Sequence, residues 1–178
     1  YNKKNESYAY QKIDPYLGYA HTMQNESQLA FGDSISGCAV LIKKEVINKV
    51  GFLDPIFFAY YEETDLFARV LRAGYKISYN PSALIWHKVA ASSGSMSYFY
   101  LYQMARNRAI FAIRNFDKLF YDHFKKDYLN KGLRSVFSYL VLSIKGGNKD
   151  LLAEIKARRN AFLWVVWHWF GLQKQRKN

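Results

Sequence analysis

Residues 51–66 read GFLDPIFFAYYEETDL, so three carboxylates lie within four positions directly after an aromatic loop. Acidic side chains in the first turn of a helix are favoured by the helix dipole, which predicts a helix beginning near Glu62 and ending near Ala73. A carboxylate at a helix N-terminus beside aromatic rings is also placed to accept a proton from a bound hydroxyl, as a general base does. The segment therefore predicts a helix and leaves two roles open for its acids, capping and catalysis.

The surrounding sequence alternates short apolar runs with helical patterns. A helix is predicted over 43–50, because Gly51 follows it in the manner of a C-terminal glycine cap. Short strands are predicted over Ser36–Ile42, Tyr75–Tyr79 and Ala83–His87. The first part of the chain is therefore expected to be mixed α/β.

The period becomes helical after residue 96 and stays so. Helices are predicted over Met96–Ile113, Asp117–Ile144 and Lys149–Phe170, and a break in the second is expected near Gly132. The predicted fold class is thus an α/β head followed by a helical tail, with residues 1–115 and 116–178 as the two parts.

Charge is concentrated in the tail. The net charge of the 178 residues is +12, and residues 116–178 carry 13 Lys/Arg against 5 Asp/Glu. An anionic partner is therefore expected for the tail. Because no recognised nucleic-acid-binding motif accompanies the charge, no nucleic acid is predicted as a partner. The single Cys38 excludes an intrachain disulfide, and its apolar surroundings predict a buried small residue.

An apolar, tryptophan-rich block lies within this basic tail. Residues 161–170 read AFLWVVWHWF, with Lys and Arg on both sides. No stretch approaches the roughly 18–20 apolar residues that span a bilayer. Three Trp in six residues suit the headgroup boundary of an anionic membrane, so an interfacial helix is one interpretation. A helix that packs against the head is the other.

These features follow one another in a specific order. The segments that carry it are Ser36-Gly37, Val50-Gly51-Phe52-Leu53-Asp54, Phe57-Phe58, Tyr61-Glu62-Glu63-Thr64-Asp65-Leu66, Arg69, Gly74-Tyr75-Lys76-Ile77, Pro81-Ser82-Ala83, His87 and Arg106-Asn107. This order resembles the C-terminal half of the catalytic domain of family 2 glycosyltransferases, particularly bacterial rhamnosyltransferase-like enzymes of cell-surface polysaccharide synthesis. The resemblance implies the C-terminal, acceptor-side part of a GT-A-like mixed α/β domain.

The resemblance also implies catalytic and metal-binding roles. Glu63 corresponds to the second member of the family's acid pair, usually Asp, which supplies the base, and Glu62 is a substitute for it. Asp65 is instead expected to pair with Arg69 four residues on. The family's matching His completes the coordination of Mn²⁺ or Mg²⁺ together with an Asp-x-Asp motif, so His87 is implied as a metal ligand; a structural His is the alternative. No Asp-x-Asp occurs in this sequence, so the donor-binding half is expected to precede it and the chain alone to be inactive.

Binding residues follow from the same resemblance and from residue chemistry. Acceptor binding is expected at Ser36, Gly37, Asp54, Phe58, Tyr61 and Trp86. Sugar rings pack well on aromatic planes, although about half of the aromatic side chains here should be core. Arg106 is expected to face phosphate of the donor or of a lipid-linked acceptor; a solvated Arg is the alternative.

Two functions are therefore predicted from different classes. The first is inverting transfer of a sugar from a nucleotide diphosphate sugar to a hydroxyl of a cell-surface polysaccharide or lipid-linked glycan. The alternative is a noncatalytic binding or scaffold module that engages an anionic membrane or a partner subunit through the basic tail. The expected location is the cytoplasm, peripheral at the inner face of the cell membrane, and a homodimer could complete the incomplete sheet.

Overall fold

The computed structural model describes residues 10–14, 20–23, 34–35, 37–78, 80, 85, 97–145 and 148–176. These residues fall into two compact units. The first, here called the head unit, holds the strands and the helices α1 (Lys44–Val50) and α2 (Glu62–Arg72). The second, the helical unit, holds residues 59–61 and the helices α3 (Tyr98–Asn115), α4 (Lys118–Lys145) and α5 (Lys149–Lys174).

The sheet of the head unit is small and antiparallel. Its strands are β1 (Tyr10–Ile13), β2 (Ala20–Met23) and β3 (Ser34–Ile35), in the order β2-β1-β3. Tyr10 of β1 pairs with Met23 on one side and with Ile35 on the other. Strand β3 contacts α2, which brings the chain after β3 to the first turn of that helix.

The core of the head unit lies between α1 and α2. Val46, Leu66 and Val70 are buried there, and the partly buried Ile42, Val50, Tyr75 and Ile77 pack around them. Helix α1 ends at Gly51, whose φ of 78° is in the left-handed region that favours glycine and whose N–H donates to the carbonyl of Ile47. The predicted glycine cap is confirmed.

A short polar side chain caps the N-terminus of each of the helices α3, α4 and α5. Ser97 accepts from the Tyr100 N–H at 3.1 Å, Asp117 from the Phe120 N–H at 2.9 Å and Asn148 from the Asp150 N–H at 2.8 Å. Such caps satisfy backbone donors that have no partner within the helix. The three helices predicted after residue 96 are confirmed, within four residues at each end.

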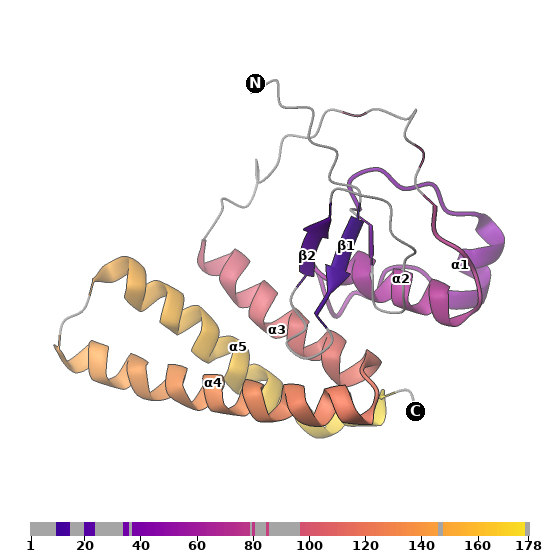
Figure 1. Cartoon of the computed structure of the whole chain (residues 1–178). Helices are drawn as coiled ribbons and strands as arrows, with labels where there is room; N and C mark the ends of the chain where they lie inside the picture. Colours follow the sequence, from indigo (N-terminus) through magenta and orange to yellow (C-terminus); the bar gives the residue numbers. More distant parts are fainter. Residues whose placement is uncertain are drawn as a thin grey trace. The chain divides into compact units, whose positions relative to one another are not determined.

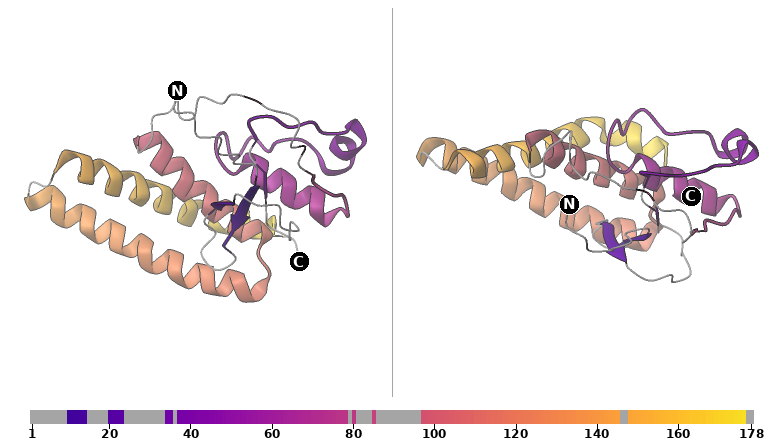
Figure 2. Two further views of the ribbon diagram at one scale, coloured as in Figure 1. Left: turned by 45° about the horizontal axis from the view of Figure 1, so that its top comes forward. Right: turned by 90° about the horizontal axis from the view of Figure 1, so that it is seen from above.

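Helices α4 and α5 form an antiparallel hairpin, and α5 also packs along α3 (Figures 1 and 2). A chain of aromatic contacts runs through this unit: ring centroids lie 6.0 Å apart for Phe111 and Phe116, 5.9 Å for Phe116 and Phe124, and 5.5 Å for Phe124 and Tyr128. Tyr128 continues it to Phe162 of α5 at 5.7 Å. The helical unit therefore has an aromatic core of its own.

The predicted α/β fold class is wrong. The described part of the chain is dominated by helices, and its sheet consists of three short antiparallel strands rather than the buried strands of a GT-A-like domain. Residues 37–43 form turns and coil, with Leu41 fully exposed, and residues 75–78 are also coil. The apolar side chains at 75 and 77 contribute to a helix-covered core instead of a sheet. The predicted strand over 83–87 lies outside the described residues, apart from Ile85.

Two further expectations are corrected. Helix α4 continues through Gly132, because the ring of Phe162 occupies the space where a side chain at 132 would lie. Cys38 is exposed rather than buried, since its segment is a turn and not a core strand. Among the helices that the structure describes, none combines the length and apolar character needed to cross a membrane.

Candidate functional site

The candidate site is the acid pair Glu62 and Glu63 at the start of α2. One carboxylate oxygen of each, Oε2, is buried without a hydrogen-bond partner among the described residues. Burial, and secondly the charge of Glu62, raise the pKa of Glu63 from an ordinary 4.5 to about 7. A carboxylate whose pKa lies near neutral pH can take up a proton from a hydroxyl far more readily than an ordinary, exposed Glu. The helix dipole favours the charged form at this position, but burial outweighs it.

Gly37 lies next to Glu63. A Cβ built at Gly37 would be 3.3 Å from both Cβ and Cγ of Glu63, which is closer than side chains usually approach. The structure thus brings together two residues that sequence reasoning assigned to one site, the base and part of the acceptor-binding set. Ser36 lies outside the described residues.

Asp65 has a structural role in the same helix. Its Oδ2 accepts from Nε of Arg69 at 2.8 Å, and both side chains are largely buried. The Arg69 guanidinium also donates to the carbonyl oxygens of Val50 and Phe52. These hydrogen bonds connect α2 to the end of α1. The predicted pair of Asp65 with Arg69 is confirmed. Within the part of the chain that the structure describes, neither Glu62 nor Glu63 forms such an ion pair.

Asp54 caps the turn that begins the aromatic loop. Its Oδ1 accepts from the N–H of Ile56 at 2.9 Å, an Asx-type turn. Three non-glycine residues of this loop have positive φ: Phe58 at 59°, Tyr60 at 67° and Tyr61 at 70°. Each costs of order 1–3 kcal/mol, and such strain persists only where the surrounding structure enforces it. The loop before the acid pair is therefore held against its local preference.

Residues 59–61 at the end of the loop are held by side chains of α3. Nδ2 of Asn107 donates to the carbonyl oxygens of Ala59 and Tyr60, at 2.7 and 2.8 Å. Tyr61 is buried, with its ring 5.9 Å from that of Phe111. Sequence reasoning placed Tyr61 in the acceptor site and missed the anchoring role of Asn107. The only signal for Asn107 was its place in the Arg106-Asn107 pair.

Phe58 and Arg106 differ in exposure. The Phe58 side chain is exposed, so it can contact a ligand. Arg106 is buried rather than solvated: it donates to Gln103 and to Oδ1 of Asn107, and its guanidinium lies 4.1 Å from the ring centroid of Trp164. These bonds orient Asn107 toward the loop carbonyls.

A metal site is not formed by the residues that the structure describes. No group of three or more His, Cys, Asp or Glu among them could hold a metal ion. His87, the ligand implied by the resemblance, and Trp86, the expected sugar-stacking residue, lie outside the described residues. The metal role of His87 and the sugar-stacking role of Trp86 therefore stay predictions.

Comparison with known proteins gives a partial match. No family model matches the chain, and no solved structure matches it significantly. Over 60 residues the chain is 37% identical to an N-acetylglucosaminyl-diphospho-decaprenol L-rhamnosyltransferase of Mycobacterium tuberculosis, in the strains CDC 1551 / Oshkosh and ATCC 25618 / H37Rv. The match covers 34% of this chain and 20% of the relative, so the chain spans about a fifth of the length of the curated relatives it matches. The chain thus contains a segment similar to a glycosyltransferase.

Proposed function

We propose that this chain carries the acceptor-activating base of a glycosyltransferase and that Glu63 is this base. The observation that carries the proposal is the buried Oε2 of Glu63 at the start of α2, with a pKa near 7. The partial similarity to a rhamnosyltransferase supports sugar transfer as the reaction class. Glycine at 37 supports the site as well, because it leaves the surface beside Glu63 without a side chain.

The proposed reaction is an inverting displacement. The Glu63 carboxylate takes the proton of the acceptor hydroxyl while that oxygen forms a bond to the anomeric carbon of the donor sugar. The bond from the anomeric carbon to the diphosphate oxygen breaks, and the nucleotide diphosphate leaves with the electron pair. General-base catalysis of this kind contributes about 10²- to 10⁴-fold to the rate.

The test replaces Glu63 by Gln in the chromosomal copy of the gene, so that the cell itself produces the variant protein. Extracts are supplied with a labelled nucleotide diphosphate sugar, and label in the lipid and polysaccharide fractions is measured. Glu63→Gln should lower turnover by about 10²- to 10⁴-fold and leave donor KM nearly unchanged. The matched control is Glu45→Gln, which removes an exposed acid from the first turn of α1. Normal turnover with Gln at 63 would exclude the role of base.

The donor and acceptor are proposed from the partial relatives. Their name specifies transfer of L-rhamnose to N-acetylglucosaminyl-diphospho-decaprenol, so activated rhamnose and a lipid-linked acetylglucosamine acceptor are the first substrates to assay. UDP- and dTDP-linked sugars supplied in parallel define the nucleotide.

A requirement for Mn²⁺ or Mg²⁺ is proposed from the resemblance, with His87 as a ligand. His87→Ala should raise the Mn²⁺ concentration needed for half-maximal turnover, because one ligand is lost. An unchanged metal titration would assign His87 a structural role. Because this sequence holds no Asp-x-Asp, calorimetry of these 178 residues with UDP and Mn²⁺ should show no binding.

A further inference from the structure

Helix α5 presents an exposed apolar face. Leu163, Val166, Trp167 and Phe170 recur at the spacing of one helix face, and their side chains are exposed. Trp167 and Phe170 keep 85% and 81% of their surface accessible. The opposite face of the helix is the packed one, with Ala161 and Val165 fully buried. The exposure of these four side chains therefore follows from the packing of α5 against α3 and α4.

Cations flank this face at both ends. Lys156 lies two turns before Leu163, and Lys174 lies one turn after Phe170. Both lysines are exposed and lie on the same side of α5 as the apolar face. The two acids of α5 are elsewhere: Asp150 lies in the first turn, and Glu154 pairs with Arg158 at 3.0 Å. The segment from Lys156 to Lys174 thus forms a stripe about 27 Å long, apolar in the middle and cationic at its ends.

We propose that this stripe, residues 156–174 of α5, lies on the surface of an anionic lipid bilayer. Trp167 and Phe170 enter the boundary between headgroups and acyl chains, and Lys156 and Lys174 contact lipid phosphates. Charge complementarity favours lipid over a second copy of the chain, because antiparallel pairing of two such stripes would set Lys156 against Lys174 of the other copy. Leu163 and Val166 favour lipid over nucleic acid, whose bases stack on aromatic rings.

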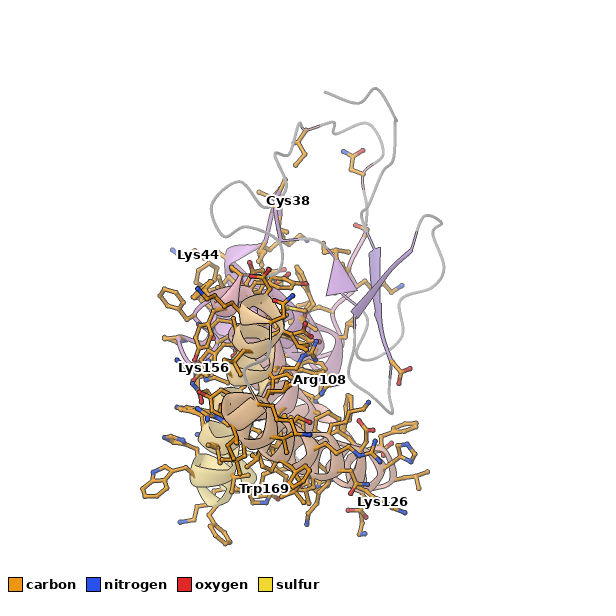
Figure 3. The ribbon with its side chains drawn as sticks, turned by 90° about the vertical axis from the view of Figure 1, so that its left-hand side faces the viewer. Cys38, Lys44, Arg108, Lys126, Lys156 and Trp169 are labelled. Atoms are coloured by element: carbon orange, nitrogen blue, oxygen red, sulfur yellow. The ribbon has the colours of Figure 1, made fainter. Side chains whose placement is uncertain are left out.

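The structure separates the three tryptophans that the sequence grouped together. Trp164 stacks on His168 with centroids 4.0 Å apart and contacts Arg106, while Trp169 lies 6.3 Å from the ring of Tyr121. Trp164 and Trp169 therefore make contacts within the helical unit (Trp169 is labelled in Figure 3). Only Trp167 is on the stripe, so it alone of the three is assigned to the lipid. This assignment goes beyond the proposed sugar transfer and does not depend on it.

The test measures binding of the chain to vesicles of phosphatidylcholine with and without phosphatidylglycerol. Sedimentation should show binding only to the anionic vesicles, and weaker binding as salt is raised. Trp167→Ala with Phe170→Ala should weaken binding by about 10²- to 10⁴-fold, because the two aromatic side chains no longer enter the bilayer. Lys156→Gln with Lys174→Gln should weaken it by up to about 30-fold at low salt. Brominated lipids should quench the wild type more strongly than Trp167→Phe.

Controls on α4 keep the result specific to the stripe. Lys126→Gln removes an exposed cation of α4, which Figure 3 shows apart from Lys156, and should leave binding within about twofold. Phe137→Ala removes an exposed aromatic of α4 in the same way. Circular dichroism should show that all variants keep the wild-type helix content. Equal binding to neutral vesicles, loss of binding in Phe137→Ala but not in the stripe variants, or self-association abolished by Trp167→Ala would each overturn the proposal.

Discussion

Replacing Glu63 by Gln should stabilise the folded chain above neutral pH. Burial and the charge of Glu62 raise the pKa of Glu63 from 4.5 to about 7 in the folded chain. Each pKa unit corresponds to about 1.4 kcal/mol, so the charge on Glu63 costs on the order of 3 kcal/mol of folding free energy at high pH. Gln keeps the shape of the side chain and carries no charge, so this cost disappears.

The sign of the pH dependence follows from proton counting. Between pH 4.5 and about pH 7 the unfolded chain has released the Glu63 proton while the folded chain retains it. Wild-type stability therefore falls as pH rises through this window and levels off above it. The free energy of unfolding of Glu63→Gln minus that of wild type should therefore increase across the same window. This difference should be about 3 kcal/mol larger near pH 8 than near pH 4.

Urea denaturation of both proteins, followed by circular dichroism across this pH range, measures the difference. Hydrogen exchange of the α2 amides assigns the change to the head unit. Glu45→Gln serves as the control, because Glu45 lies exposed in the first turn of α1 and should give a change within about 0.5 kcal/mol. If Glu63 were only a capping charge, Gln would destabilise the chain increasingly as pH rises. That opposite slope would refute the reasoning.

Four further substitutions test the packing. Gly132→Ala should lower the free energy of unfolding by about 1–3 kcal/mol, because its Cβ would lie 2.0 Å from the Phe162 ring. Gly171→Ala should raise it by up to about 1 kcal/mol, because no atom lies within 4 Å of the added Cβ and alanine favours the helix. Thermal denaturation measures both changes. Arg69→Gln removes an ion pair and two hydrogen bonds to carbonyls and should cost about 3 kcal/mol in urea denaturation. Asn107→Ala leaves two loop carbonyls without this donor, so limited proteolysis should cut the loop faster; an unchanged rate would show that other contacts hold it.

The helices could be predicted from the sequence because their signals are local. Gly51 ends α1 by its own φ angle, and the side chains of Ser97 and Asn148 bond to backbone groups two or three residues away. The pair of Asp65 and Arg69 was also predictable, since a spacing of four fixes it on one helix face. Each of these features needs only residues within one turn of the chain.

The errors concern contacts between distant residues. The apolar run over 36–42 resembles a strand, but strand formation depends on neighbours that the run itself does not specify, and the described part of it forms turns. The break expected at Gly132 does not occur because Phe162, thirty residues on, fills the space over the glycine. Near the candidate site, the sequence predicted roles for Glu62 and Glu63, which stay predictions, and gave no sign that Asn107 of α3 bonds to the loop carbonyls 47 and 48 residues before it.

Phe58 combines two features that are each unfavourable. It adopts a left-handed backbone conformation, and its ring remains 77% exposed, so burial of the ring offsets little of the backbone strain. Glycine would suit the backbone here and would sacrifice little buried area, unlike at Tyr61, whose ring is in the core. The stability of the free chain alone would thus favour glycine at position 58 over the phenylalanine that the sequence has there.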